Sequence, residues 1–139
     1  MIDIDNQTNY PINESFLETI LCDLTQKDIE LIITNNETIQ TLNKEYRNID
    51  KATDVLSFPY EEMPMAPLGS IIISIDYVQN KAHELGHSED DEFFLLFIHG
   101  LLHLLGYDHE CDNGEMREQE EALIHKHKLP NSLIVRTEG

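Results

Sequence analysis

Hydrophobic residues along the chain recur with two periodicities, one typical of helices and one typical of strands. Five segments repeat apolar residues every three to four positions, as helices with a buried face do. Three shorter segments are rich in β-branched and aromatic residues and are bounded by turn-forming residues, which indicates strands. The predicted helices are residues 16–24, 37–47, 76–85, 91–105 and about 115–126, and the predicted strands are residues 28–34, 54–60 and 70–75.

The predicted helix 91–105 differs from the others because it is apolar nearly all round, which indicates a buried, central position. Ser88 and Asp91 have the spacing of a capping box at its start. Gly86 marks the end of the helix before it, since glycine favours the position that follows a helix. We therefore expect two consecutive helices with a short connection, of which the second lies in the core.

Two residues in the other segments give local predictions. In the helix 37–47 the spacing predicts that Tyr46 faces inward. Pro59 either stops the strand 54–60 or places it at a sheet edge. Strands mixed with helices, with helices alone at the end of the chain, predict a single α+β domain. In this domain a small sheet packs against the buried helix and further helices. The order of the strands is not readable from these patterns.

Acidic residues outnumber basic residues by 27 to 9, which gives a formal net charge of −18. A protein with this charge repels polyanions at long range, so a nucleic-acid partner needs a local positive feature to hold it. Lys44, Arg47 and Lys51 make residues 44–51 the densest basic patch in the chain. On the residues alone, Arg47 fits a phosphate contact and a salt bridge at a helix end about equally well.

The two cysteines, Cys22 and Cys111, lie far apart in the sequence, which argues against a disulfide framework and predicts reduced thiols in the cytoplasm. No apolar run approaches the length needed to span a membrane. The N-terminal residues lack the basic start and apolar stretch of a secretion signal. We therefore expect a cytoplasmic protein without a membrane partner.

The segment HGLLHLLGYDH, residues 99–109, carries the most specific chemistry in the chain. His99 and His103 are four residues apart and lie one turn apart on the same face of a helix. Gly106 then allows the chain to turn out of the helix, so that His109 can return toward the first two. Three imidazoles that meet at one point predict a transition-metal site, and a tetrahedral ion held by three ligands keeps one position open.

Gly100 decides against one function for this site. The histidine spacing equals that of a class of zinc proteases, but those enzymes have their Glu general base where this chain has Gly100. General-base assistance contributes a factor of roughly 10²–10⁴ to the rate. Three neutral imidazoles also leave the double positive charge of the ion uncancelled, which favours an anionic substrate such as a phosphodiester.

Two neighbours of the motif bear on the metal. Asp108 is adjacent to His109 and is a candidate to accept a hydrogen bond from a ligand imidazole. Cys111 is close enough to be a fourth ligand, which would close the site and make the ion structural. All-imidazole ligation suits zinc, and nickel, copper and iron also accept it.

The motif resembles the metal-binding segment of the YbeY endoribonucleases, a family of rRNA maturation factors. Further segments of the chain are also similar to this family, and together they extend roughly from Leu31 to Leu123. One position departs from the family pattern, because Ser70 stands where the family usually has an acidic residue. The similar segments are LNKEYRNIDKATDVLSFP (42–59), LGSIIIS (68–74), ELGHS (84–88) and MREQEEAL (116–123).

The resemblance implies an α+β fold with a small mixed sheet and one zinc ion bound by His99, His103 and His109. It implies that Arg47 is the functional arginine, flanked by Lys44 and Lys51. The implied activity is metal-dependent cleavage of single-stranded RNA in maturation of the 3′ end of small-subunit ribosomal RNA, with a role in ribosome quality control. The implied partners are the small ribosomal subunit and its proteins, and a ribosome-associated GTPase.

Two other functions stay open. The protein can be a ribosome-assembly factor in which the metal holds the fold and catalysis is weak or absent, and its acidic surface suits basic ribosomal proteins. A hydrolase of small molecules or peptides is less favoured, because it needs a basic group in place of the missing Glu.

Overall fold

Four strands form one mixed sheet in the order β1-β2-β4-β3, in which β1, β2 and β4 run parallel and β3 pairs antiparallel with β4. The structure is a computed structural model and describes residues 1–60, 67–108 and 112–129. The third strand ends at Pro59 and also lies at the sheet edge, so both alternatives that the sequence offers for Pro59 hold. The strands are β1 (Ile2–Asn6), β2 (Ile29–Thr34), β3 (Val55–Pro59) and β4 (Gly69–Ser74).

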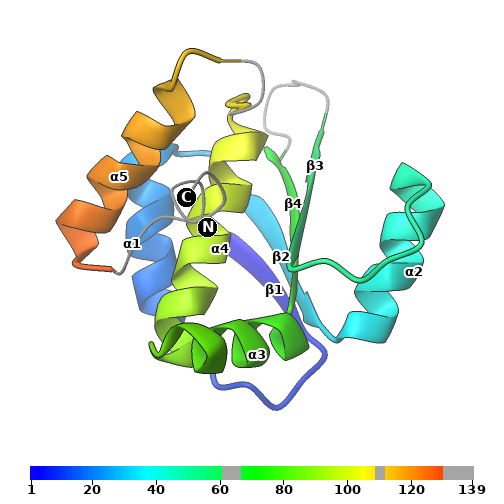
Figure 1. Cartoon of the computed structure of the whole chain (residues 1–139). Coiled ribbons are helices and arrows are strands. Elements are labelled where there is room, and N and C mark those ends of the chain that lie inside the picture. The colour runs from blue at the N-terminus through cyan, green and yellow to red at the C-terminus, as the bar shows by residue number, and fades with distance from the viewer. Residues whose placement is uncertain (61–66, 109–111, 130–139) are drawn as a thin grey trace.

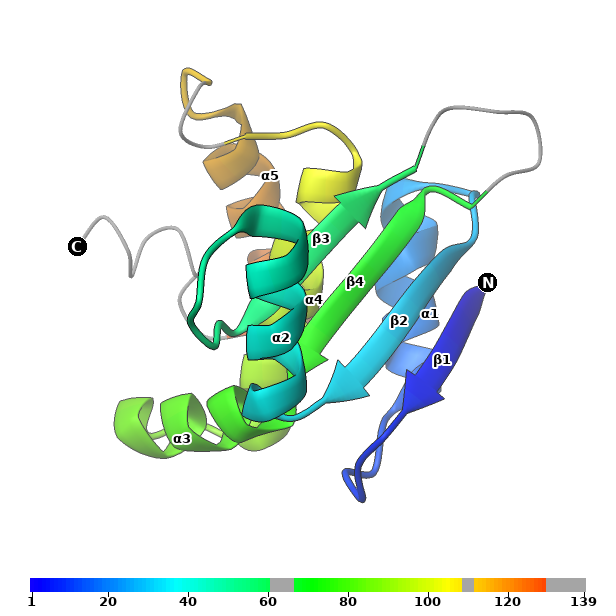
Figure 2. The same cartoon turned by 90° about the vertical axis from the view of Figure 1, so that its right-hand side faces the viewer.

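Helices cover both faces of this sheet unequally. Helices α1, α4 and α5 lie on one side of the sheet, α2 lies on the other, and α3 runs across one end (Figures 1 and 2). This arrangement confirms the predicted α+β domain with a buried central helix. In the part of the chain that the structure describes, no helix has the length and apolarity to cross a membrane. The helices are α1 (Glu14–Leu24), α2 (Asn36–Arg47), α3 (Ile75–Leu85), α4 (Glu89–Leu104) and α5 (Glu115–His127).

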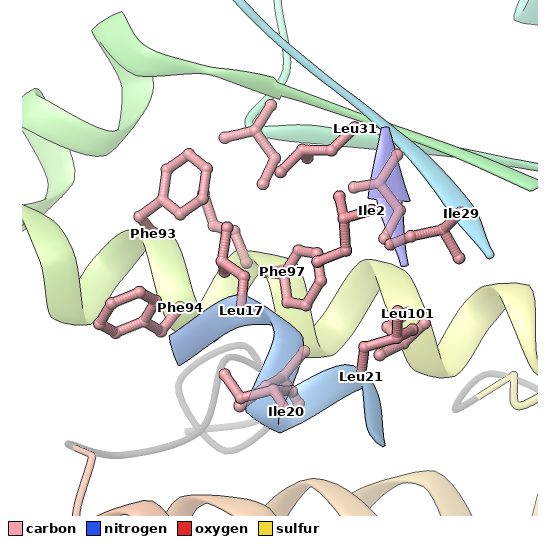
Figure 3. Close-up of a cluster of buried hydrophobic side chains, with 14 of the residues drawn as sticks. Ile2, Leu17, Ile20, Leu21, Ile29, Leu31, Phe93, Phe94, Phe97 and Leu101 are labelled. Carbon is pink, nitrogen blue, oxygen red and sulfur yellow. The ribbon is translucent and has the colours of Figure 1, made fainter. Parts of the chain in front are cut away.

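The inner strand β4 contributes side chains to two clusters of the core, one on each face of the sheet. All six of its residues are buried, with α4 packed on one face and α2 on part of the other. Ile71 and Ile73 belong to the large cluster under α4, whereas Ile72 belongs to a small cluster under α2. Figure 3 shows Phe93 and Phe97 of α4 among side chains of α1, β1 and β2. The helix that carries the histidines is therefore anchored in the largest part of the core.

Helix α4 starts and helix α3 ends through the local interactions that the sequence predicts. The Ser88 hydroxyl accepts a hydrogen bond of 3.1 Å from the Asp91 backbone N–H at the start of α4. Gly86 ends α3 with a φ of 75°, a left-handed conformation that costs glycine little. These interactions involve near neighbours in sequence, so the sequence pattern suffices to predict them.

Two features differ from the sequence prediction. Strand β1 is not predicted, although Ile2 and Ile4 alternate with acidic residues; its pairing with β2 is a long-range contact that periodicity does not reveal. Tyr46 is 64% exposed instead of facing inward. It lies in the last turn of α2, where its ring packs against Phe58 of the edge strand, with ring centroids 5.5 Å apart. The small cluster under α2 ends before this turn.

The C-terminal end of α5 is tied to α1 by Asp23. Lys126 Nζ donates to one Asp23 oxygen at 2.7 Å, and His127 Nε2 contacts the other at 2.9 Å. The hydrogen bond from Lys126, together with that from His127, lowers the pKa of the Asp23 carboxyl from its ordinary value. These contacts hold α5 across the same face of the sheet as α4.

We expect Gly69→Ala to destabilise the sheet next to the site. A Cβ at Gly69 would lie 2.5 Å from the Phe58 carbonyl oxygen and 2.9 Å from Pro59 Cα, so the β3 backbone must move. Overpacking of this kind costs about 1–3 kcal/mol of unfolding free energy, measurable by urea denaturation. Gly100→Ala is the comparison, because the three atoms nearest to its Cβ belong to side chains, the closest at 3.0 Å. Equal stability of the two variants would contradict the prediction.

Candidate metal centre

Two imidazole rings meet at the C-terminal end of α4. His99 is buried and His103 is half-buried. Their Nε2 atoms lie 3.2 Å apart, and the two rings are nearly perpendicular at 82°. The spacing of four residues along a helix brings the rings together, as the sequence predicts.

The other nitrogen of each ring is held by an acceptor. His103 Nδ1 lies 3.0 Å from the Tyr107 backbone carbonyl, and His99 Nδ1 lies 3.3 Å from the Glu120 Oε2. A carbonyl oxygen and a carboxylate accept hydrogen bonds, so this geometry suits a proton on each Nδ1. In a neutral imidazole this leaves a lone pair on Nε2. With both rings neutral and in this tautomer, the two Nε2 lone pairs face each other.

Two ring nitrogens at this separation share either a proton, as a hydrogen bond, or a metal ion. In a tetrahedral site with Zn–N distances of 2.0–2.1 Å, two ligand nitrogens are about 3.3 Å apart. The observed separation of 3.2 Å therefore fits a zinc ion bound by both rings. The hydrogen bonds from Nδ1 to a carboxylate and to a carbonyl are the usual outer partners of zinc-binding histidines.

A turn after α4 brings the Tyr107 carbonyl into place. Gly106 has a φ of 97°, as expected for a residue that turns the chain out of a helix. The backbone N–H of Gly106 donates to the His103 carbonyl at 3.0 Å, and that of Tyr107 donates to the Leu102 carbonyl at 3.1 Å. The turn at Gly106 therefore has two effects. It ends α4, and it places the carbonyl that orients the His103 ring.

Glu120 is a candidate site residue that the sequence analysis did not single out. It is fully buried on α5, on the same face as the buried residues Met116 and Leu123. A carboxylate on an apolar helix face is rare without a partner. The position of Glu120 on that face was therefore the sequence signal that it has a buried partner. Its partner is His99, which lies on a different helix and becomes a neighbour only after α5 packs on α4.

The remaining predicted ligands are placed as follows. His109 and Cys111 lie outside the described residues. Asp108 is exposed, and its backbone carbonyl accepts a hydrogen bond of 3.0 Å from the Asp112 N–H. Its predicted hydrogen bond to a ligand imidazole stays a prediction. Within residues 1–60, 67–108 and 112–129, no group of three or more His, Cys, Asp or Glu side chains forms a metal-binding cluster.

Position 100 faces the sheet. A Cβ at Gly100 would lie 3.0 Å from Ser57 Oγ and 3.1–3.2 Å from side-chain carbons of Ile71 and Val55. The Ser57 hydroxyl also donates to the Gly100 carbonyl at 3.0 Å. A longer side chain at this position would collide with β3 and β4. The close packing of α4 on the sheet thus gives a structural reason for glycine where a zinc protease has its general base.

The predicted basic residues lie at the end of α2, on the other face of the sheet. Arg47 is exposed and is the last residue of the helix. Lys44 is exposed with its Nζ 3.9 Å from an Asp50 carboxylate oxygen, and Lys51 is exposed with its backbone carbonyl bound to Asn43. The ends of α2 and α4 point to the same end of the molecule, on opposite sides of β3 (Figures 1 and 2). The structure thus places the basic patch and the histidines across an edge strand from one another.

Comparisons with known proteins find sequences that are similar over nearly the whole chain. A family model described as "Endoribonuclease YbeY" matches residues 3–128. A protein of that name from Aliarcobacter butzleri is 64% identical over 138 residues, which cover 98% of this chain and 99% of the relative. Another from Nautilia profundicola is 63% identical over 138 residues and covers 99% of both chains.

The fold is also similar to a solved structure. The solution structure of TM1509 from Thermotoga maritima matches with a TM-score of 0.62 and 27% sequence identity, and the match covers 91% of this chain and 88% of that one. The family match extends over both the histidine segment and the arginine segment. The chain therefore belongs to the YbeY endoribonuclease family.

Proposed function

We propose that this protein is a zinc-dependent endoribonuclease that cleaves single-stranded RNA. Family membership supports RNA as the substrate, and the names of the relatives state an endoribonuclease activity. The observation that carries the metal dependence is the pair of Nε2 atoms of His99 and His103, 3.2 Å apart, with both Nδ1 atoms bound to acceptors.

His99, His103 and His109 would hold the ion, and neutral ligands would leave its charge available to an anionic substrate. Zinc in this site would act as a Lewis acid that polarises a phosphoryl oxygen of the RNA. One side chain and one backbone carbonyl prepare this site before substrate arrives. Glu120 and the Tyr107 carbonyl hold the two imidazoles in one tautomer and one orientation.

Arg47 would bind the phosphate that reacts. A guanidinium group presents several N–H donors in one plane and suits the charge that a phosphodiester gains in the transition state. The exposure of Arg47 leaves the side chain accessible to a large substrate. Lys44 and Lys51 would contribute positive charge to the same approach path.

We further propose a role in maturation of the 3′ end of small-subunit ribosomal RNA and in ribosome quality control, in the cytoplasm. The net charge of −18 disfavours capture of free RNA, so the small ribosomal subunit would present the substrate. Small-subunit proteins and a ribosome-associated GTPase are the proposed partners. The same acidic charge favours a second candidate, an assembly factor with a structural metal.

RNA cleavage by purified, zinc-loaded protein tests the proposed function. We expect single-stranded RNA to be cut, cleavage to stop with a chelator, and cleavage to return when zinc is restored. Analysis of the product ends then identifies the nucleophile: a cyclic phosphate indicates the 2′-hydroxyl of the RNA, and a 5′-phosphate indicates water. A zinc-loaded protein that binds small ribosomal subunits without cutting RNA would favour the assembly factor, and cleavage of peptides would favour a different hydrolase.

Glu120→Gln tests how the metal site is held. The substitution keeps the size of the side chain but removes the carboxylate that orients His99, so we expect zinc affinity to fall about 10- to 100-fold. Competition with a chromophoric chelator measures this without an activity assay. Glu121→Gln is the matched control, because Glu121 is exposed on the same helix and pairs with Arg117 at 3.1 Å. Equal zinc affinity in both variants would remove Glu120 from the metal centre.

A further inference from the structure

The face of the sheet that α2 packs on is only partly covered. Its small hydrophobic cluster consists of Ile39, Leu56 and Ile72, with other side chains partly buried against it. Figure 2 shows that the ends of β3 and β4 beyond α2 carry no helix on this face. The strand register places Phe58 opposite Ser70, and side chains of paired residues share a face of the sheet. Phe58 therefore lies at the border of the part of the sheet that α2 covers.

Exposed aromatic side chains gather at this uncovered end. Tyr46 follows Ile39 and Leu42 along the sheet-facing side of α2, and its ring is 5.5 Å from that of Phe58 at an angle of 59°. Tyr46 is nevertheless 64% exposed, and Tyr60, just beyond β3, is 41% exposed. The Tyr60 hydroxyl contacts Ser70 and donates to the Glu30 carboxylate at 2.9 Å, which holds its ring on this face.

Charge indicates which partner this surface fits. Lys44 and Arg47 lie in the last turn of α2 next to Tyr46, and Lys51 follows the turn. The three basic residues outnumber the two acidic residues of the segment, Glu45 and Asp50. The net charge of residues 44–51 is therefore positive, in a chain whose total charge is −18. Aromatic rings beside cationic side chains are the pattern by which proteins hold single-stranded nucleic acid.

We infer that the exposed ring of Tyr46, with Phe58 packed against it, forms a stacking platform on which a base of single-stranded RNA lies, with the adjoining phosphates held by Lys44 and Arg47. This inference rests on the proposed function. The platform is on the α2 side of β3 and the histidines are on the other, so the RNA strand would bend over the edge strand. Because every base has an aromatic face, the platform binds single strands with little sequence preference. A rigid duplex would not follow this path.

Binding of labelled 2′-O-methyl oligonucleotides, followed by fluorescence anisotropy, tests the platform in the zinc-loaded protein. We expect Tyr46→Ala to weaken binding of oligo-U and oligo-A alike, by about 5- to 100-fold, and to raise KM for cleavage of ordinary RNA more than it lowers kcat. Tyr46→Phe keeps the ring and should bind within about twofold of the wild type. Tyr77→Ala is the matched control, because Tyr77 is 37% exposed on α3, at another end of the molecule.

The outcomes separate this inference from the proposed function. Wild-type protein that cleaves RNA while Tyr46→Ala binds as tightly as the wild type would overturn the platform alone. Tyr46→Phe binding as weakly as Tyr46→Ala would also overturn it, since the hydroxyl and not the ring would then matter. Loss of binding to small ribosomal subunits with unchanged RNA affinity would assign the surface to a protein partner instead. Wild-type protein that neither binds nor cleaves RNA would overturn both proposals.

Discussion

His103→Ala is expected to remove both the metal and the activity. The substitution deletes one of the two nitrogens that face each other at the end of α4 and leaves His99 Nε2 without its neighbour at 3.2 Å. Zinc content should fall from one ion per chain toward zero, measured by elemental analysis after dialysis. RNA cleavage should fall by about 10³-fold or more, because a Lewis acid contributes several kcal/mol of transition-state stabilisation.

The control for this variant is a histidine outside the site. His83 lies in the last turn of α3, at a different end of the molecule, so His83→Ala should keep both zinc and activity. A His103→Ala protein that retains full zinc occupancy would mean that the ligands are assigned wrongly. Retained cleavage without zinc would contradict the metal dependence itself.

Arg47→Ala is expected to reduce RNA cleavage while zinc content stays at the wild-type level. Loss of a single donor to a developing negative charge costs about 10²–10³ in kcat. The helix should be little affected, because Arg47 is exposed at its last position and Asn48 still ends it in the left-handed conformation. Kinetics on a single-stranded RNA, with elemental analysis of the same samples, measure both quantities.

Arg117→Ala provides a matched control for Arg47. It removes another exposed arginine, on α5, whose ion pair with Glu121 is of the i,i+4 type and is worth only about 0.3–0.5 kcal/mol when exposed. Cleavage by Arg117→Ala should therefore stay near the wild-type rate. Unchanged turnover in Arg47→Ala would remove this residue from the mechanism, and an equal loss in both variants would indicate a general effect of positive charge.

The parts of the site that depend on local sequence were predictable. The spacing of His99 and His103 places both rings on one face of a helix, whatever the rest of the fold does. The turn at Gly106 and the hydrogen bond between Ser88 and Asp91 likewise join near neighbours. Periodicity alone therefore sufficed for the helix, its start and its end.

The parts that depend on distant contacts were not predictable. Glu120 reaches His99 only because α5 packs on α4. A single sequence does not show which residue a buried carboxylate contacts. The exposure of Tyr46 depends on how far α2 covers the sheet, although its helical position matches that of the buried Ile39. Strand β1 similarly requires β2 as its neighbour. In each case the deciding contact lies far away in the chain.

Glu120 also links the metal centre to the C-terminal helix. It belongs to α5, whose far end is fastened to α1 through Asp23. Under the proposed function, ion affinity and the docking of α5 are thermodynamically coupled, and such coupling is reciprocal. The factor by which a docked α5 tightens ion binding equals the factor by which a bound ion favours docking. Any contact that weakens the packing of α5 would therefore lower the affinity of the metal centre for its ion.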